Sequence, residues 1–177
     1  MTTHFYTATS LDGFIATPEH SLDWLLKQDF DEEGPMAYPA FIAGIGALAM
    51  GASTYEWLRK HDSVWSYEQP TWVFTHRALE APEGADVRIT QAGIREVHAE
   101  MTAAANGKDL WIVGGGDLAG QFADEGLLDE VWLQYAPVTL GAGAPVLPRT
   151  LDLELIELAR NRSFLCGRYR VTKSQGA

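Results

Sequence analysis

The sequence of 177 residues is poor in basic residues and contains a single cysteine. Lys and Arg total 13 against 24 Asp and Glu, so the formal net charge is −11. Proteins that bind nucleic acid need a clustered basic face to neutralise its phosphates. No segment concentrates Lys and Arg, so we exclude nucleic acid as a partner. Because Cys166 is alone, it cannot form an internal disulfide, and an oxidising compartment is not required.

Long apolar runs and metal-binding spacings are also missing. The N-terminal MTTHFYTATSLDGF lacks the basic and apolar regions of a signal peptide, and no segment approaches ~18 uninterrupted apolar residues. We therefore expect a cytoplasmic protein with no membrane partner. The five histidines show no H-E-x-x-H or paired spacing, so we expect no metal. With 46% hydrophobic and 21% charged residues, the composition predicts one globular domain over 1–177.

Strand patterns alternate with helix patterns along most of the chain. Apolar and β-branched runs predict strands over 4–10, 47–50, 71–75, 87–90, 110–113 and 130–138. Helical spacing predicts helices over 22–26, with Ser21 as its cap, and over 54–61, 94–105 and 117–126. Segment 29–46 is interrupted by Gly and Pro, and residues 153–173 resemble two antiparallel strands. This order predicts an α/β, three-layer fold with a mostly parallel central sheet and an antiparallel C-terminal hairpin at one edge. Ligands of such sheets bind at the carboxyl ends of the strands.

A turn of three glycines is the strongest local motif. Gly114, Gly115 and Gly116 separate a buried strand from a helix, and without Cβ atoms their N–H groups can approach an anion such as a pyrophosphate. A tight turn that needs positive φ is the alternative. The turn also matches the loose dinucleotide fingerprint G-x-G-x-x-G/A. However, it follows a late strand, and no acidic residue ends the next strand, so a Rossmann fold is disfavoured.

Two further junctions at strand ends carry groups that suit phosphates. At the first junction, the N–H groups at the start of a helix can bind a phosphate. At the second, an arginine beside a hydroxyl can clamp a phosphate. Helix capping and an unspecific exposed arginine are the alternatives. The residues concerned are Gly51, Ser53 and Thr54 after one strand, and Thr75, His76 and Arg77 after the next.

The order of five segments resembles the dihydrofolate reductase-like family. These segments are SLDGFIA, ALAMGASTYEWL, VFTHR, WIVGGGDLAGQFADEGLLDEVWLQYAPVTLGAGAPV and GRYRV, and together they cover nearly the whole chain. The resemblance is strongest to the reductase domain of the bifunctional riboflavin-biosynthesis deaminase-reductase and to its single-domain relatives.

This resemblance implies an NADPH-dependent reductase that transfers a hydride to a small heterocyclic (pterin- or pyrimidine-like) or carbonyl substrate. It also implies a homodimer, for which the strand around Trp132 and Tyr135 and the C-terminal hairpin offer surface. By position, the cofactor would contact the three junctions, including Asp117 and Leu118 after the glycine turn, with a cis peptide between Gly114 and Gly115. Asp12 and Gly13 would lie in the loop that covers the nicotinamide.

The sequence departs from the family at two places. Ala52 stands where the family often has a basic residue that contacts the 2′-phosphate, so Arg77 would carry that contact, and NADH is a second candidate cofactor. In the substrate half, Asp23, Trp24 and Tyr38 are candidates to bind a flat heterocycle, and a core position for Trp24 is the alternative. No catalytic residue is assigned. These departures also keep open a non-catalytic relative that binds a nucleotide or flavin without turnover.

Overall fold

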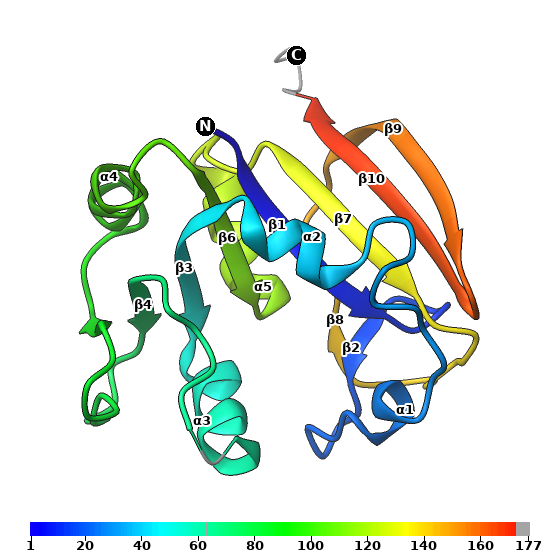
Figure 1. Cartoon of the computed structure of the whole chain (residues 1–177), viewed down its shortest axis with the longest axis horizontal. Helices are drawn as coiled ribbons and strands as arrows, with labels where there is room; N and C mark the ends of the chain where they lie inside the picture. The colour runs from blue at the N-terminus through cyan, green and yellow to red at the C-terminus, as the bar shows by residue number, and fades with distance from the viewer. Residues whose placement is uncertain (63, 173–177) are drawn as a thin grey trace.

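An eight-stranded sheet forms the centre of the computed structural model, which describes residues 1–62 and 64–172 (Figure 1). The strand order is β5-β4-β3-β6-β1-β7-β10-β9. Strands from β5 to β7 run parallel, and β10 and β9 are antiparallel at the edge, so the predicted sheet is confirmed. The bounds are β1 (Thr3–Thr9), β3 (Ile45–Gly51), β4 (Thr71–Phe74), β5 (Val87–Thr90), β6 (Asp109–Gly114), β7 (Glu130–Tyr135), β9 (Asp152–Asn161) and β10 (Phe164–Thr172). Residue 173, the predicted end of the hairpin, lies outside the described residues.

Helices cover both faces of this sheet and give it three layers. On one face, Val97 of α4 (Ile94–Ala104) and Phe122 of α5 (Gly116–Asp124) pack with Phe5 in the largest core cluster. On the other face, Phe41 of α2 (Tyr38–Ala43) packs with Trp111 and neighbouring side chains of β3. Helix α3 (Ala52–His61) covers the β3–β4 part of that second face, and Figure 1 shows α2 in front of β1 with α5 behind β6.

A second, two-stranded sheet was not predicted. Strands β2 (Phe14–Ala16) and β8 (Ala144–Pro145) pair in antiparallel fashion. They contain only three and two residues, which is too short to show a strand period in the sequence. The pairing brings the loop after β1 against the segment 138–146 that follows β7.

Two local predictions were wrong, and one helix formed in a segment for which no element was predicted. Helix α1 (Asp23–Leu26) has Leu22 rather than Ser21 as its N-cap, and the Ser21 hydroxyl accepts the Asp23 N–H at 3.1 Å from one residue further out. Helix α2 forms inside the interrupted segment 29–46, because Pro39 lies in the first helical turn, where its missing N–H costs nothing. Residues 51–53, placed in a turn between the predicted strand over 47–50 and the predicted helix over 54–61, instead end β3 and begin α3.

Candidate functional site

Strand register brings the three predicted junctions to one edge of the sheet. Met50 of β3 pairs with Gly114 of β6, and Gly51 pairs with Phe74 of β4. The strands are parallel, so all of their carboxyl ends face the same way. The glycine turn, the start of α3 and the Thr75–Arg77 segment therefore lie side by side, as the sequence predicted.

The helices at these junctions have open N-termini. The N-caps of α3 and α5 are Gly51 and Gly115, and no side chain caps either helix. Ser53 and Thr54 lie inside α3, so the alternative that their hydroxyls cap it is wrong. The first-turn N–H groups and the positive end of each helix dipole are thus available to an anion.

The three glycines of the turn differ in what an added Cβ would meet. The peptide between Gly114 and Gly115 is cis, as the resemblance implied, and Gly114 has a φ of 159°. A Cβ on Gly114 would lie 3.1 Å from the Thr54 hydroxyl, and one on Gly116 would overlap the backbone carbonyls of Pro145 and Val146. At Gly115 the space is open, because the nearest atom to an added Cβ is the Ile15 Cδ1 at 3.9 Å. Only at Gly115 does the missing side chain leave room for a ligand.

Asp117 and Leu118 present only their backbone to the glycine turn. The Asp117 carboxylate accepts hydrogen bonds from Arg149, at 3.2 Å, and from Gln121, at 2.9 Å. The Leu118 side chain is buried in the core. A contact of either residue with a phosphate would therefore use its N–H group.

At the third junction, the Arg77 guanidinium already has a partner. Its Nη1 lies 2.9 Å from Oε1 of Glu56, a residue of α3 that the sequence analysis did not single out. The Arg77 N–H also donates to the Thr75 hydroxyl at 2.9 Å, which tightens the turn after β4. His76 is exposed beside them. The pairing of Glu56 with Arg77 could not be read from spacing, since 21 residues separate the two in the sequence.

Asp12 fastens the loop that follows β1. Its carboxylate accepts the Ser10 hydroxyl at 2.6 Å and the backbone N–H groups of Leu140 and Gly141 at 2.7 to 3.1 Å. These hydrogen bonds, that of Ser10 first, lower the pKa of Asp12 to about 2. Gly13 has a φ of +86°, and its carbonyl accepts the Val146 N–H at 2.9 Å. The loop thus lies against the glycine turn, but Asp12 holds the loop in place rather than presenting a free carboxylate.

The structure does not support Trp24 as a ring platform. Its side chain is only 5% exposed and packs with Ala136, Phe164 and Cys166, so the alternative of a core position is confirmed. Its indole Nε1 is buried without a hydrogen-bond partner among the described residues. Asp23, at the start of α1, is exposed.

Tyr38 belongs to an aromatic group on the α2 side of the sheet. Its ring centroid lies 5.8 Å from that of Trp111 and 6.4 Å from that of Tyr6, and it is the most exposed of the three at 37%. Burial raises the pKa of Tyr38 and that of Tyr6, so both remain neutral. Trp111 precedes Gly114 by three residues on β6, a distance of about 10 Å along a strand. Tyr38 was predicted from the sequence, but the aromatic group was not, because its members are far apart in the chain.

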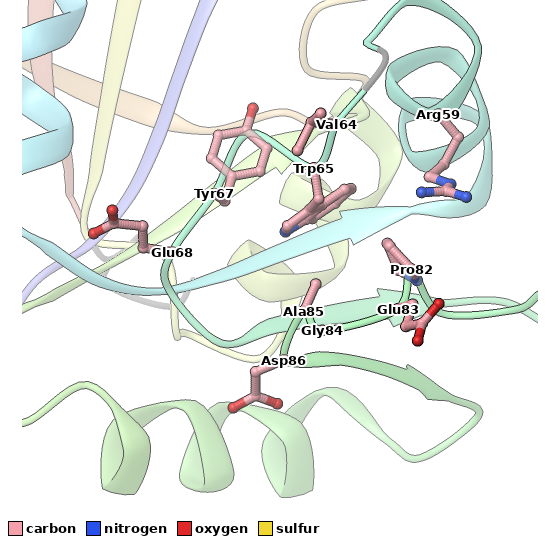
Figure 2. A pocket seen from close by; sticks show the side chains of 10 residues that line it. All are labelled: Arg59, Val64, Trp65, Tyr67, Glu68, Pro82, Glu83, Gly84, Ala85 and Asp86. Carbon is pink, nitrogen blue, oxygen red and sulfur yellow. The ribbon is translucent and has the colours of Figure 1, made fainter.

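A cavity of about 420 Å³ lies at the opposite end of β4 and β5 (Figure 2). Its walls come from α3 and from the segments that precede β4 and β5, and they contain none of the predicted site residues. The lining residues are Arg59, Val64, Trp65, Tyr67, Glu68, Pro82, Glu83, Gly84, Ala85 and Asp86. The cavity is therefore separate from the candidate cofactor edge.

The described part of the chain, residues 1–62 and 64–172, lacks two kinds of feature. Over these residues, no group of three or more His, Cys, Asp and Glu side chains has a geometry that could hold a metal ion. In the same part of the chain, no helix combines the length and apolar character needed to cross a membrane.

Known proteins resemble this chain over most of its length. It is 31% identical to the uncharacterized protein YwjB of Bacillus subtilis, over 92% of this chain and 91% of YwjB. It is 29% identical to the riboflavin biosynthesis protein RibD of Corynebacterium ammoniagenes, over 91% of this chain but only 49% of that protein. The chain thus spans about half of that RibD.

Solved structures show the same architecture. A candidate riboflavin biosynthesis protein from Shewanella sp. PV-4 superimposes with a TM-score of 0.84 and 27% identity, over 98% of this chain and 100% of that one. Dihydrofolate reductase from Enterococcus faecalis, solved with NADP(H) and RAB-propyl, has a TM-score of 0.63 and 14% identity, over 97% of both chains. Residues 52–168 match the RibD C-terminal domain family. This match spans more than half of the chain, which therefore belongs to the RibD C-terminal domain family and has a dihydrofolate reductase-like fold.

Proposed function

We propose that this chain is an NADPH-dependent reductase of a small heterocyclic or carbonyl substrate. The observation that carries the proposal is the adjacency of the open N-termini of α3 and α5 and the Arg77 segment, at the carboxyl ends of neighbouring parallel strands. A dinucleotide has a pyrophosphate and a more distant 2′-phosphate, and such an edge offers groups for both. The reductase-like relatives in its family favour the same function.

The residues of this edge fit the cofactor. The space above Gly115 would receive the pyrophosphate, with the N–H groups of the first turn of α5 as donors. The N-terminus of α3, at Ala52 to Thr54, would approach the phosphates from the next strand. Thr75, His76 and Arg77 would surround the adenosine ribose, with Arg77 on the 2′-phosphate. When bound, NADPH would supply the hydride.

The remaining residues position the substrate and exclude water. Tyr38, the most exposed member of the aromatic group, would offer a ring face and a neutral hydroxyl to a flat molecule on the α2 side. The loop that Asp12 fastens would cover the site from the β2–β8 side. Holding two rings in contact and away from water accounts for much of the rate enhancement in hydride transfer. The proton that completes reduction of a C=N or C=O group can come from solvent.

A titration with NADPH tests the proposal. NADPH added to the protein should change the fluorescence of its six tryptophans in a saturable way, and Gly115→Ala should weaken that binding. Loss of reduced nicotinamide absorbance, with a panel of pterins, pyrimidines and carbonyl compounds, would then identify the substrate class. Failure to bind NADPH at millimolar concentrations would refute the proposal. Binding without turnover of any substrate would instead favour the non-catalytic relative, which Ala52 and the buried Trp24 also favour.

A further inference from the structure

The cavity of about 420 Å³ drawn in Figure 2 has the volume of a small-molecule site. Pockets that bind small ligands run from roughly 300 to 1,000 Å³. The last turn of α3 and the segments 64–68 and 82–86 form its walls. None of these residues belongs to the edge that we assign to NADPH, so a molecule bound here would be a second ligand of the chain.

One wall of the cavity is an aromatic surface fixed by the core. The ring centroid of Trp65 lies 5.7 Å from that of Tyr55 and 5.4 Å from that of Tyr67, and all three rings pack in the core cluster around Met50. Val64 lines the cavity next to Trp65 and is 76% exposed, the largest value for a large apolar side chain in the described part of the chain. This wall therefore favours an apolar ring over water.

The cavity also holds charged groups that have no partner within residues 1–62 and 64–172. Most arginines of these residues pair with a carboxylate, but Arg59 makes no ion pair and no side-chain hydrogen bond with any of them. Glu68 and Glu83 form no ion pair there either, whereas Asp86 is paired with Arg88 at 2.9 Å. In a chain with a net charge of −11, an arginine without a carboxylate partner is available to an anionic group of a ligand.

We propose that this cavity binds a small zwitterion with an aromatic side group, of the class of the aromatic amino acids. The ligand carboxylate would lie on the Arg59 guanidinium, the ammonium on Glu83 and the ring on Trp65. The two charges of an amino acid are carried by one carbon atom, so their partners must lie at one end of the site. Figure 2 shows Arg59 and Glu83 toward one end of the cavity and Glu68 toward the other. Phosphates are disfavoured, because the lining carries three carboxylates against one guanidinium.

L-phenylalanine and two of its analogues test the site. In an NMR titration, the indole N–H signal of Trp65, identified by its loss in Trp65→Phe, should shift saturably with a dissociation constant of about 1 mM or below. The signal of Trp24, which is buried in a different cluster, should not move. Phenylpropionate lacks the ammonium and phenethylamine lacks the carboxylate, so each should bind more weakly than L-phenylalanine. Saturating L-phenylalanine should leave the dissociation constant of NADPH unchanged.

Two variants assign the charges of the probe to their partners. Arg59→Met should raise the dissociation constant of L-phenylalanine at least about threefold and leave that of phenethylamine unchanged. Glu83→Gln should weaken L-phenylalanine and phenethylamine but not phenylpropionate. Lys60→Met and Glu68→Gln are the matched controls, because they remove an exposed charge from α3 outside the cavity and from the other end of the cavity. Both should bind L-phenylalanine as the parent does.

Three results would overturn the proposal, and none of them depends on whether the chain binds NADPH. The first is an unmoved Trp65 signal at about 20 mM L-phenylalanine, well above the expected dissociation constant. The second is equal affinity for L-phenylalanine and both analogues, because the charges would then have no partners. The third is the parent's affinity for L-phenylalanine in folded Arg59→Met and Glu83→Gln.

Discussion

Arg77 and Glu56 form an ion pair at the end of the sheet edge that we assign to the adenosine ribose. The Nη1–Oε1 distance is 2.9 Å, and the side chains are 55% and 44% exposed. Ala52 supplies no cation nearby, so in the proposed complex Arg77 would serve both the Glu56 carboxylate and the 2′-phosphate. Cofactor preference would then depend on how these two anions compete for one guanidinium.

We first predict that Arg77→Ala reduces the preference for NADPH over NADH while the fold stays intact. A hydrogen bond to a charged group contributes roughly 1.5 to 3 kcal/mol, and tenfold in affinity corresponds to about 1.4 kcal/mol. NADPH should therefore bind about ten- to a hundredfold more weakly in a fluorescence titration. NADH lacks the phosphate, and its dissociation constant should hardly change.

The affinities of the two cofactors for Arg77→Ala distinguish a phosphate contact from a structural role of Arg77. If both bind equally more weakly, Arg77 acts through structure rather than through the phosphate. If neither is affected, the adenosine end lies elsewhere. In the parent protein, added salt should reduce the preference for NADPH over NADH, because the Arg77 side chain that would contact the 2′-phosphate is partly exposed.

The second prediction is that Glu56→Gln strengthens NADPH binding. Removal of the carboxylate frees Arg77 and removes a negative charge near the phosphate. Exposed ion pairs contribute about 0.2 to 1 kcal/mol, which corresponds to a gain of up to about fivefold. NADH should respond less. Weaker NADPH binding in this variant would mean that Glu56 is needed to orient Arg77.

Gly115→Ala gives the third prediction. With a φ of −85° and no atom within 3.9 Å of the added Cβ, the variant should fold with the parent's melting temperature. The methyl group would occupy the space assigned to the pyrophosphate. The dissociation constants of NADPH and NADH should therefore both rise by at least about tenfold. Unchanged affinity in a folded variant would return the glycine turn to a purely structural role.

Gly116→Ala is the contrasting variant. Its Cβ would overlap the carbonyls of Pro145 and Val146, and the pairing between β2 and β8 would have to shift. We therefore expect poor folding rather than a selective loss of cofactor.

The sequence predicted the parallel sheet and the edge that carries the three junctions because those elements have local signals. Strands such as 71–74 are short apolar runs bounded by turn residues, and the glycine turn stands directly between a strand and a helix. Parallel strands align their carboxyl ends, so the adjacency of the three junctions followed from topology.

Long-range pairings left no such signal. Glu56 meets Arg77 only because α3 returns along β4, and Arg149 reaches Asp117 only because the segment after β8 crosses α5. Trp24 illustrates the opposite error: a tryptophan beside an aspartate suggests a binding platform, but packing with Cys166 and Phe164 buries it. In each case, a contact between residues far apart in the sequence decided the role.

The fourth prediction concerns Asp12 and the loop it fastens. Asp12→Ala should speed hydrogen exchange at the Leu140 and Gly141 amides, which lose their acceptor. The folded pKa of Asp12, about 2, lies below its ordinary value of 3.8. The stabilisation of the folded protein by the Asp12 carboxylate is therefore complete above about pH 4 and is lost as the pH falls through 2. Asp23→Ala, which removes an exposed carboxylate of α1, should leave these amides unchanged. If the Leu140 and Gly141 amides exchanged at the same rate in both variants, Asp12 would not be the residue that fastens this loop.

The last prediction concerns the pair of Glu130 and Arg168, which joins β7 to β10. The guanidinium donates two hydrogen bonds to Glu130, at 2.8 and 3.0 Å, and stacks 4.6 Å from the Trp132 ring centroid. Burial raises the pKa of Glu130, but the bonds from Arg168 outweigh it and hold that pKa below its usual value. The pair therefore stabilises the fold above the unfolded pKa of about 4.3, and this contribution is lost as the pH falls. Arg168→Met leaves a carboxylate with an 11% exposed side chain without its main partner, so the free energy of unfolding at about pH 7 should fall by roughly 2 to 4 kcal/mol.

The sign of the pH dependence separates this role from lost packing. In Arg168→Met, the contacts of Glu130 with Trp132 and His4 remain, but the larger lowering contribution of Arg168 is lost. Burial then raises the pKa of Glu130 above its value in the parent, so protonation relieves the unpaired charge. Urea denaturation should then show a deficit against the parent that shrinks between about pH 7 and about pH 4. Arg170→Met is the matched control, because its partner Glu154 is 58% exposed and such pairs contribute at most about 1 kcal/mol. A deficit that stays constant with pH would assign the effect to the lost contact with Trp132, since that contact does not titrate with Glu130.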